Sequence, residues 1–272
     1  MKSILVYLLI PFFLWGNGLN AAKDSTVFQL VRTIPVKSTY LTVDNLYNLY
    51  VATEDGQIRK YNEQGVQQFD YNNYRYGAVG KIDVRNPLNI LVYYPELASV
   101  VILDRTLSEM RQLNLFDLDL IEPKAVAIAN DNNLWIFDQV AAILRKVNQE
   151  GATLFESRNL NQLTRKNLNP AFLQESNNLI YLSDAEQGLF VFDAFGQLKQ
   201  QFPIHGMASF QVIDKKVIYR QAEKISILST DNGDFETLGV PFDLKEVQQI
   251  YFKGNTIYVA QADALQIYQR EQ

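Results

Sequence analysis

The sequence predicts an all-β protein, a six-bladed β-propeller of four-stranded blades that is closed by the N-terminal strand joining the last blade. Three observations predict this fold. A pattern of short strands separated by polar turns recurs six times, with copies beginning at residues 48, 89, 133, 178, 216 and 255. One further short strand precedes each copy, which gives units of about 40 residues and four strands, as in propeller blades. The sixth copy lacks its last strand, whereas residues 26–35 are a strand candidate without a blade.

Each expected element follows from its local pattern. The strand that opens each blade is expected at residues 40–44, 81–84, 125–129, 172–174, 210–213 and 249–252. Residues 134–137 and 189–192 are apolar at successive positions, which is typical of strands covered on both faces. One short helix is expected within residues 160–168. Pairing of residues 26–35 with the last blade would remove both open edges of the ring. A β-sandwich without repeats is the alternative fold.

The N-terminus has the pattern of an export signal. Lys2 precedes an apolar run at residues 4–15, and the small residues Ala21 and Ala22 follow a polar stretch. The run is shorter than the roughly 20 residues that a membrane-spanning helix needs. We therefore expect a signal peptide at 1–22, a single propeller domain at 23–272, and a periplasmic, cell-surface or secreted protein. An uncleaved membrane anchor is the alternative.

The composition excludes several classes of function. The chain has 30 acidic and 25 basic residues, and a net charge of −5 gives no basic face for nucleic acid. It has no cysteine, which excludes disulfides and thiol chemistry. Its single histidine, His205, excludes metal sites built from several histidines, and no nucleophile motif accompanies it. We therefore expect no catalytic residue, although His205 is the one histidine available to a catalytic triad.

The first copy, residues 48–69, reads Asn-Leu-Tyr-Val-Ala, then Gly-Gln-Ile-Arg-Lys-Tyr-Asn, then Gly-Val-Gln-Gln-Phe. On the basis of this copy, the chain resembles the six-bladed β-propellers of the NHL-repeat and gluconolactonase-like superfamily, especially the exported bacterial members. This resemblance implies a divalent metal at the mouth of the central channel, held by carboxylates and amides near the start of the innermost strands. The corresponding positions here are Tyr40, Lys81, Lys124, Phe172, Ser209 and Gln248, with Asp83 as the one acid nearby.

We expect Tyr40, Lys81, Lys124 and Gln248 to line the channel. This set departs from the cation site of the family, so no metal and no cofactor is expected. The two lysines could attract an anionic ligand or simply be solvated. The oxygen-rich segments 130–133 and 231–234 could bind calcium, but turn formation explains their Asn, Asp and Gly residues better.

Aromatic residues concentrate in two segments near the first and second blades. These are Tyr71, Tyr74, Arg75 and Tyr76, and then Tyr93 and Tyr94. Tyrosine and arginine are common anchors of interfaces and sugar sites, so we expect a binding patch. The alternative is that these tyrosines fill gaps between blades.

The sequence therefore predicts an exported, non-catalytic binding platform for a protein or glycan partner. The alternatives are a metal-dependent hydrolase or lactonase of the same fold, and a structural component of an envelope complex.

Overall fold

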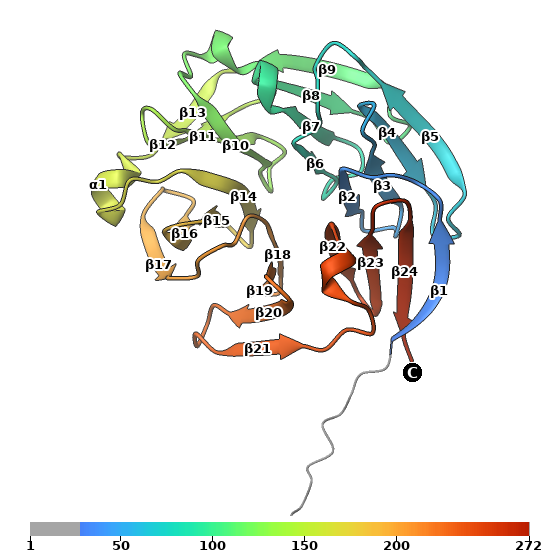
Figure 1. Cartoon of the computed structure of the whole chain (residues 1–272). Coiled ribbons are helices and arrows are strands. Elements are labelled where there is room, and N and C mark those ends of the chain that lie inside the picture. The colour runs from blue at the N-terminus through green and yellow to red at the C-terminus, as the bar shows by residue number, and fades with distance from the viewer. Residues whose placement is uncertain (1–27, 272) are drawn as a thin grey trace, which may run out of the picture.

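The computed structural model describes residues 28–271 and confirms the six-bladed ring. Within these residues, six four-stranded antiparallel sheets surround one axis (Figure 1). The predicted signal peptide at 1–22 lies outside the described residues and stays a prediction. No helix between residues 28 and 271 is long and apolar enough to cross a membrane.

In the first three blades, the strands follow one another from the axis outward. Blade 1 holds β2 (Tyr40–Val43), β3 (Leu49–Ala52), β4 (Gln57–Tyr61) and β5 (Gln67–Asn72). Blade 2 holds β6 (Lys81–Asp83), β7 (Ile90–Tyr94), β8 (Ser99–Leu103) and β9 (Glu109–Asn114). Blade 3 holds β10 (Pro123–Ile128), β11 (Leu134–Asp138), β12 (Ile143–Val147) and β13 (Thr153–Glu156).

The next two blades repeat this order, and the sixth differs only in its outer strand. Blade 4 holds β14 (Pro170–Ser176), β15 (Leu179–Asp184), β16 (Gly188–Asp193) and β17 (Leu198–Phe202). Blade 5 holds β18 (Phe210–Ile213), β19 (Lys216–Gln221), β20 (Lys224–Ser229) and β21 (Phe235–Leu238). Blade 6 holds β22 (Gln249–Lys253), β23 (Thr256–Ala260), β24 (Leu265–Arg270) and, outermost, β1 (Phe28–Ile34).

The ring closes because the two ends of the described chain share blade 6. β1 pairs antiparallel with β24, with Phe28 opposite Arg270 and Ile34 opposite Leu265. This confirms the expected closure by residues 26–35, of which the structure places 28–34 in β1. Pairing supplies partners for the backbone groups along β24 that an open ring would leave at an edge.

Helices occur only in the connections between strands of the described chain. The short helix expected within residues 160–168 is α1 (Leu160–Thr164), which begins after Asn159 and ends at Arg165 in the left-handed region, at φ 55°. The Asn159 side chain caps it by accepting a hydrogen bond from the Gln162 N–H at 3.0 Å. Single turns of 3-10 helix form η1 (Pro95–Leu97), η2 (Leu115–Leu118) and η3 (Leu244–Glu246).

The apolar core lies between neighbouring blades. One cluster joins Trp135 and Phe137 of blade 3 to Phe190 and Phe192 of blade 4, all fully buried. Similar clusters join blades 1 and 2, blades 4 and 5, and blades 6 and 1. Full burial of one large apolar side chain contributes about 1.5–3 kcal/mol, so this packing holds the blades in fixed positions.

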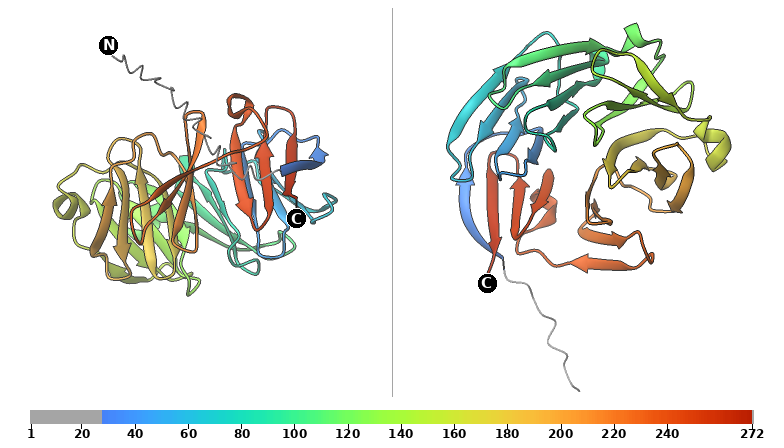
Figure 2. Two further views of the ribbon diagram at one scale, coloured as in Figure 1. Left: turned by 90° about the horizontal axis from the view of Figure 1, so that it is seen from below. Right: turned by 180° about the vertical axis from the view of Figure 1, so that it is seen from behind.

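The inner strands β2, β6, β10, β14, β18 and β22 all begin on one face of the ring. We call it the entry face, and the opposite side the exit face. Figure 1 looks onto the entry face, where η1 and η3 lie in front of the sheets, and the right view of Figure 2 shows the exit face. Loops between successive blades gather on the entry face.

Candidate functional site

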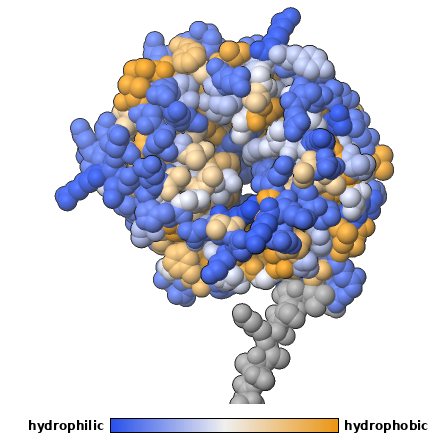
Figure 3. All heavy atoms as spheres, in the orientation of Figure 1, coloured by the Kyte–Doolittle hydropathy of each residue, from blue (hydrophilic) through white to orange (hydrophobic). Residues whose placement is uncertain are grey.

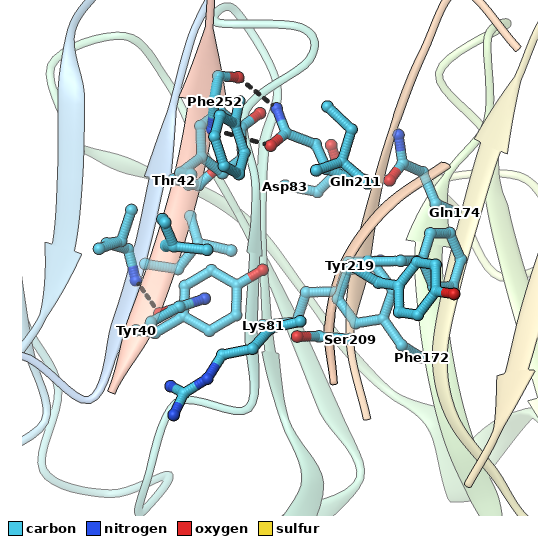
Figure 4. Close-up of a pocket in the computed structure, with 18 of the residues that line it drawn as sticks. Tyr40, Thr42, Lys81, Asp83, Phe172, Gln174, Ser209, Gln211, Tyr219 and Phe252 are labelled. Carbon is cyan, nitrogen blue, oxygen red and sulfur yellow. Dashed lines mark hydrogen bonds between the residues drawn. The ribbon is translucent and has the colours of Figure 1, made fainter. Parts of the chain in front are cut away.

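A cavity of about 130 Å³ lies on the axis of the ring. Residues of five inner strands, β2, β6, β14, β18 and β22, and of β19 line it. Figure 4 shows Tyr40, Lys81, Ser209 and Phe172 toward one end, and Thr42, Asp83, Gln211 and Gln174 toward the other. Because Tyr40 and Lys81 begin their strands, the first end opens toward the entry face. Of the four residues expected to line the channel, Tyr40, Lys81 and Gln248 line this cavity.

Three charged side chains alternate along β6 and just beyond it. Lys81, Asp83 and Arg85 are two residues apart, so they share one side of the strand. Arg85 forms an ion pair with Asp83 at 2.7 Å and donates hydrogen bonds to the carbonyls of Ile128 and Glu175. Asp83 also accepts a hydrogen bond from the Ile128 N–H at 3.3 Å. These contacts link β6 to the inner strands β10 and β14 of the next two blades.

Lys81 is the buried amine of the cavity. Its Nζ lies 4.2 Å from the centre of the Phe172 ring and donates a hydrogen bond to the Leu173 carbonyl. No carboxylate in the described chain lies within ion-pair distance of this nitrogen. Burial lowers the pKa of Lys81 to about 7, although the charge of Asp83 acts in the opposite direction. At neutral pH the amine therefore exchanges between its charged and neutral forms.

The cavity does not fit the divalent-metal site that the family resemblance implies. Asp83 is the only acid among the described residues that line it, and Arg85 donates hydrogen bonds to both of its oxygens. Burial raises the pKa of Asp83, but Arg85 and Lys81 outweigh that effect and hold the pKa below its ordinary value. Asp83 is thus an anion already paired within the protein. Among residues 28–271 no group of three or more His, Cys, Asp or Glu is placed to hold a metal ion.

Glutamines on the inner strands cap the backbone of the next blade. Gln211 of β18 accepts a hydrogen bond from the Phe252 N–H at 2.9 Å, and its amide nitrogen donates to the carbonyl of the same residue. Gln249 accepts from the Leu41 N–H at 2.6 Å, and Gln174 makes a longer contact with β18 at 3.4 Å. Inner strands lack a backbone ladder on their axial side, so these amides satisfy groups that would otherwise lack partners.

Lys124 does not line the cavity, which corrects the sequence expectation. It is exposed and forms an ion pair with Glu122 at 3.0 Å. The register between β10 and β11 shifts between Pro123 and Ala125, so Lys124 is the extra residue of a β-bulge. A bulge changes the direction in which a side chain points, and a proline at the start of a strand favours such an irregularity.

Several residues of the cavity were not expected from the sequence. These are Arg85, Gln174, Gln211, Tyr219, Arg220 and Tyr251. A signal for some of them exists, because alternate residues of a strand share a side. Counting by two from Lys81, Phe172 and Ser209 reaches Arg85, Gln174 and Gln211.

The aromatic patch expected from the sequence is mostly interior. Tyr71, Tyr76, Tyr93 and Tyr94 are buried, and three of them belong to the apolar cluster between blades 1 and 2. The rings of Tyr76 and Tyr94 lie 4.9 Å apart. These four tyrosines therefore pack between sheets, which was the alternative interpretation, and they present no surface to a partner.

Tyr74 and Arg75 are exposed on the entry face, in the loop that joins β5 to β6. Tyr74 is 72% exposed. This loop packs against η1, because a Cβ at Gly77, whose φ is +78°, would meet the carboxylate of Glu96. Gly77 thus allows the close approach that brings the two tyrosine-containing segments together.

Four exposed apolar side chains lie over blades 2 and 3 on the same face. Leu97, Phe116, Ile121 and Val140 form what we call the entry patch. A backbone hydrogen bond of 2.8 Å joins η2 to the residue after η1, which brings Phe116 near Leu97. Asp138 accepts hydrogen bonds from the N–H groups of Ile121 and Val140, at 2.8 and 3.0 Å. Figure 3 shows apolar atoms among polar ones on this face, which is hollowed near the axis.

Acidic residues surround the entry patch. Glu96, Asp117 and Asp119 are exposed, and in the described chain none of them forms an ion pair. Glu122 is paired with Lys124. The rim of the patch therefore carries a net negative charge.

The other candidate residues named from the sequence lie in loops and turns between strands. The Nδ1 atom of exposed His205 lies 2.7 Å from the Glu186 carbonyl oxygen. Residues 130–133 form the turn between β10 and β11, where Asn132 has φ 64°. Residues 231–234 form the turn between β20 and β21, where Gly233 has φ 78°. A positive φ explains why Asn and Gly occupy positions 132 and 233 of these turns.

Comparison with known proteins supports the fold class. No protein-family model matches the sequence, and a comparison with curated proteins gives no significant match. Solved structures of other propellers do match. A catalytically inactive variant of virginiamycin B lyase from Staphylococcus aureus, with quinupristin, has a TM-score of 0.59 at 14% identity, over 85% of this chain and 80% of that one.

Two further structures are similar over a greater share of this chain. The WD40 domain of Neurospora crassa Pan2 has a TM-score of 0.62 at 10% identity, over 92% of this chain and 97% of that one. A Bacteroides thetaiotaomicron protein of unknown function has a TM-score of 0.62 at 12% identity, over 91% of this chain and 73% of that one. At these identities the similarity supports the β-propeller fold alone and leaves the activity to be inferred from the site.

Proposed function

We propose that the chain is a recognition module that binds a protein segment at the entry patch. The observation that carries this proposal is the exposure of four apolar side chains together on one face of a rigid ring. Grouped apolar residues with a polar rim are typical of protein interaction sites, whereas isolated ones are ordinary. Export, predicted from residues 1–22, would bring the module to a partner outside the cytoplasm.

The charge of the rim defines the chemistry of the partner. Glu96, Asp117 and Asp119 surround apolar side chains, so the complementary segment carries apolar anchors flanked by lysine or arginine. A protein is favoured over a glycan because Leu97, Ile121 and Val140 are aliphatic and offer no side-chain hydrogen bonds. Sugars are bound by aromatic faces and polar groups together.

Selection of peptides from a random display library tests the proposal. The wild-type chain should enrich peptides that combine apolar and basic residues. Their affinity should fall at least about tenfold for the double variant Ile121→Ser, Val140→Ser, because both anchoring contacts lose apolar area. The matched control is Leu46→Ser, Leu88→Ser, which removes two exposed apolar residues from the exit face.

The control variant should bind within about twofold of wild type. Thermal unfolding of both variants should match wild type, since all four positions are exposed. Selected peptides that bind the Ile121→Ser, Val140→Ser variant as tightly as wild type would overturn the proposal. So would a chain that binds members of a glycan array but no peptide.

A further inference from the structure

The charges that line the axial cavity are not balanced. Four lining residues are charged, and Asp83 is neutralised by Arg85. Lys81 and Arg220 remain, and in the described chain neither forms an ion pair. Arg220 donates hydrogen bonds only to backbone carbonyls, including that of Leu244 at 2.7 Å. A chain with a net charge of −5 therefore encloses a local excess of positive charge.

Aromatic side chains form part of the cavity wall. Phe172 and Phe210 lie with ring centres 5.1 Å apart, and Tyr40, Tyr219 and Tyr251 also line the cavity. The volume of about 130 Å³ is close to that of an engineered apolar cavity of about 150 Å³ known to hold benzene. Such walls favour one flat apolar ring.

Lys81 has N–H donors that remain available to a ligand. An ammonium group has three N–H donors, and the Leu173 carbonyl takes one of them. The ring of Phe172 faces the same nitrogen at 4.2 Å. An anion here would meet a positive charge in a site of low dielectric constant, where ionic interactions are strong.

We propose that the axial cavity binds a small organic anion with a flat apolar body, with its carboxylate at Lys81 and its ring against the aromatic wall. This site is distinct from the entry patch and shares no residue with it. Its ligand class is that of small aromatic carboxylates.

The pH dependence of binding follows from the charge state of Lys81. The free amine has a pKa of about 7, so above that pH a bound carboxylate must recruit a proton to the amine. Affinity should be constant between about pH 5.5 and 6.5 and should fall by up to about tenfold per pH unit above pH 7. The titratable and charged groups nearest the amine within the cavity are Asp83, Arg85, Tyr40, Tyr219, Arg220 and Tyr251. Burial raises the pKa of Tyr40, Tyr219 and Tyr251, and Asp83 is paired, so Lys81 alone titrates in this window.

Calorimetric titration with benzoate tests the proposal on the purified chain. Benzoate should bind, benzamide should bind at least about tenfold more weakly, and acetate should give no detectable heat, because only benzoate combines ring and charge. Lys81→Met should lower benzoate affinity at least about tenfold and leave benzamide unchanged. Lys124→Met is the control, since Lys124 lies near the start of the inner strand of the next blade but does not line the cavity.

Titrations in two buffers of different ionisation enthalpy measure the proton uptake. At pH 8 the wild type should take up close to one proton per benzoate, and Lys81→Met should take up none. A cooperative thermal transition of Lys81→Met establishes that the variant is folded, and Lys81→Arg should retain benzoate binding without the pH dependence. Absence of benzoate binding to the wild type up to about 10 mM would overturn the proposal, as would equal binding to Lys81→Met. Neither result bears on peptide binding at the entry patch, so the two proposals fail separately.

Discussion

The contrast between Lys81 and Lys124 shows how strongly the environment sets the chemistry of a residue. Lys81 is the first residue of the inner strand β6, and Lys124 is the second residue of the inner strand β10. Lys81 is buried against Phe172, whereas Lys124 is exposed and paired with Glu122. Burial lowers the pKa of Lys81.

The buried amine makes stability depend on pH. In the unfolded chain the pKa of Lys81 returns to its ordinary value of 10.5, whereas in the folded protein it is about 7. Between these values the unfolded chain holds the extra proton, so the free energy of unfolding rises with pH, and the cost of burying the charge is fully present below pH 7. Lys81→Met removes this dependence. The stability of wild type relative to Lys81→Met should therefore rise between pH 7 and 10, by up to about 1.4 kcal/mol per pH unit.

Urea denaturation at several pH values measures this difference. The control Lys124→Met retains Lys81, so its stability should keep the rise with pH that Lys81 causes. If the free energies of unfolding of wild type and Lys81→Met differ by the same amount at every pH from 7 to 10, that result would contradict the lowered pKa of Lys81.

At the residue scale the sequence predicts position better than environment. The repeat places Tyr40, Lys81 and Gln248 at the cavity, because equivalent positions of similar sheets face the same axis. The sequence cannot show that Tyr94 is buried while Tyr74 is exposed. Both lie in aromatic segments at the end of a strand, since Tyr94 is the last residue of β7 and Tyr74 follows β5. That distinction depends on how closely neighbouring blades pack.

At the scale of single elements, side-chain amides hold the inner strands together. Gln211 bonds both backbone groups of Phe252, a residue that is buried. Gln211→Leu should lower the free energy of unfolding by about 2 kcal/mol, because it leaves a buried N–H and C=O without partners. Gln68→Leu is the control, since Gln68 is exposed on β5, and should change stability by less than about 0.5 kcal/mol. A Gln211→Leu variant as stable as Gln68→Leu would show that the cap contributes nothing.

The sequence predicts the bounds of most blade-opening strands to within one residue. The strand expected at 210–213 is β18 with those bounds, and the one expected at 40–44 is β2, which ends one residue earlier. The exceptions are β10 and β14, which begin two residues before their expected starts. Both open with a proline and contain a bulge, and pattern alone does not locate an extra residue in a strand.

At the scale of the whole molecule, the closed ring fixes both proposed sites. The cavity exists because the inner strands meet at one axis, and the entry patch exists because loops of successive blades share a face. Both depend on the pairing of β1 with β24, which joins segments from opposite ends of the described chain.

A designed disulfide measures this closure most directly. The chain has no cysteine, and Gln29 and Gln269 are exposed partners on β1 and β24. The variant Gln29→Cys, Gln269→Cys should form an intramolecular disulfide on mild oxidation and gain about 2–4 kcal/mol of stability. The control Gln29→Cys, Gln266→Cys displaces one partner by about 10 Å along β24, beyond the reach of a disulfide. The predicted result is that a disulfide forms efficiently in the first variant and not in the control. A first variant that stays reduced would contradict the closed ring, and so would a control that oxidises equally well.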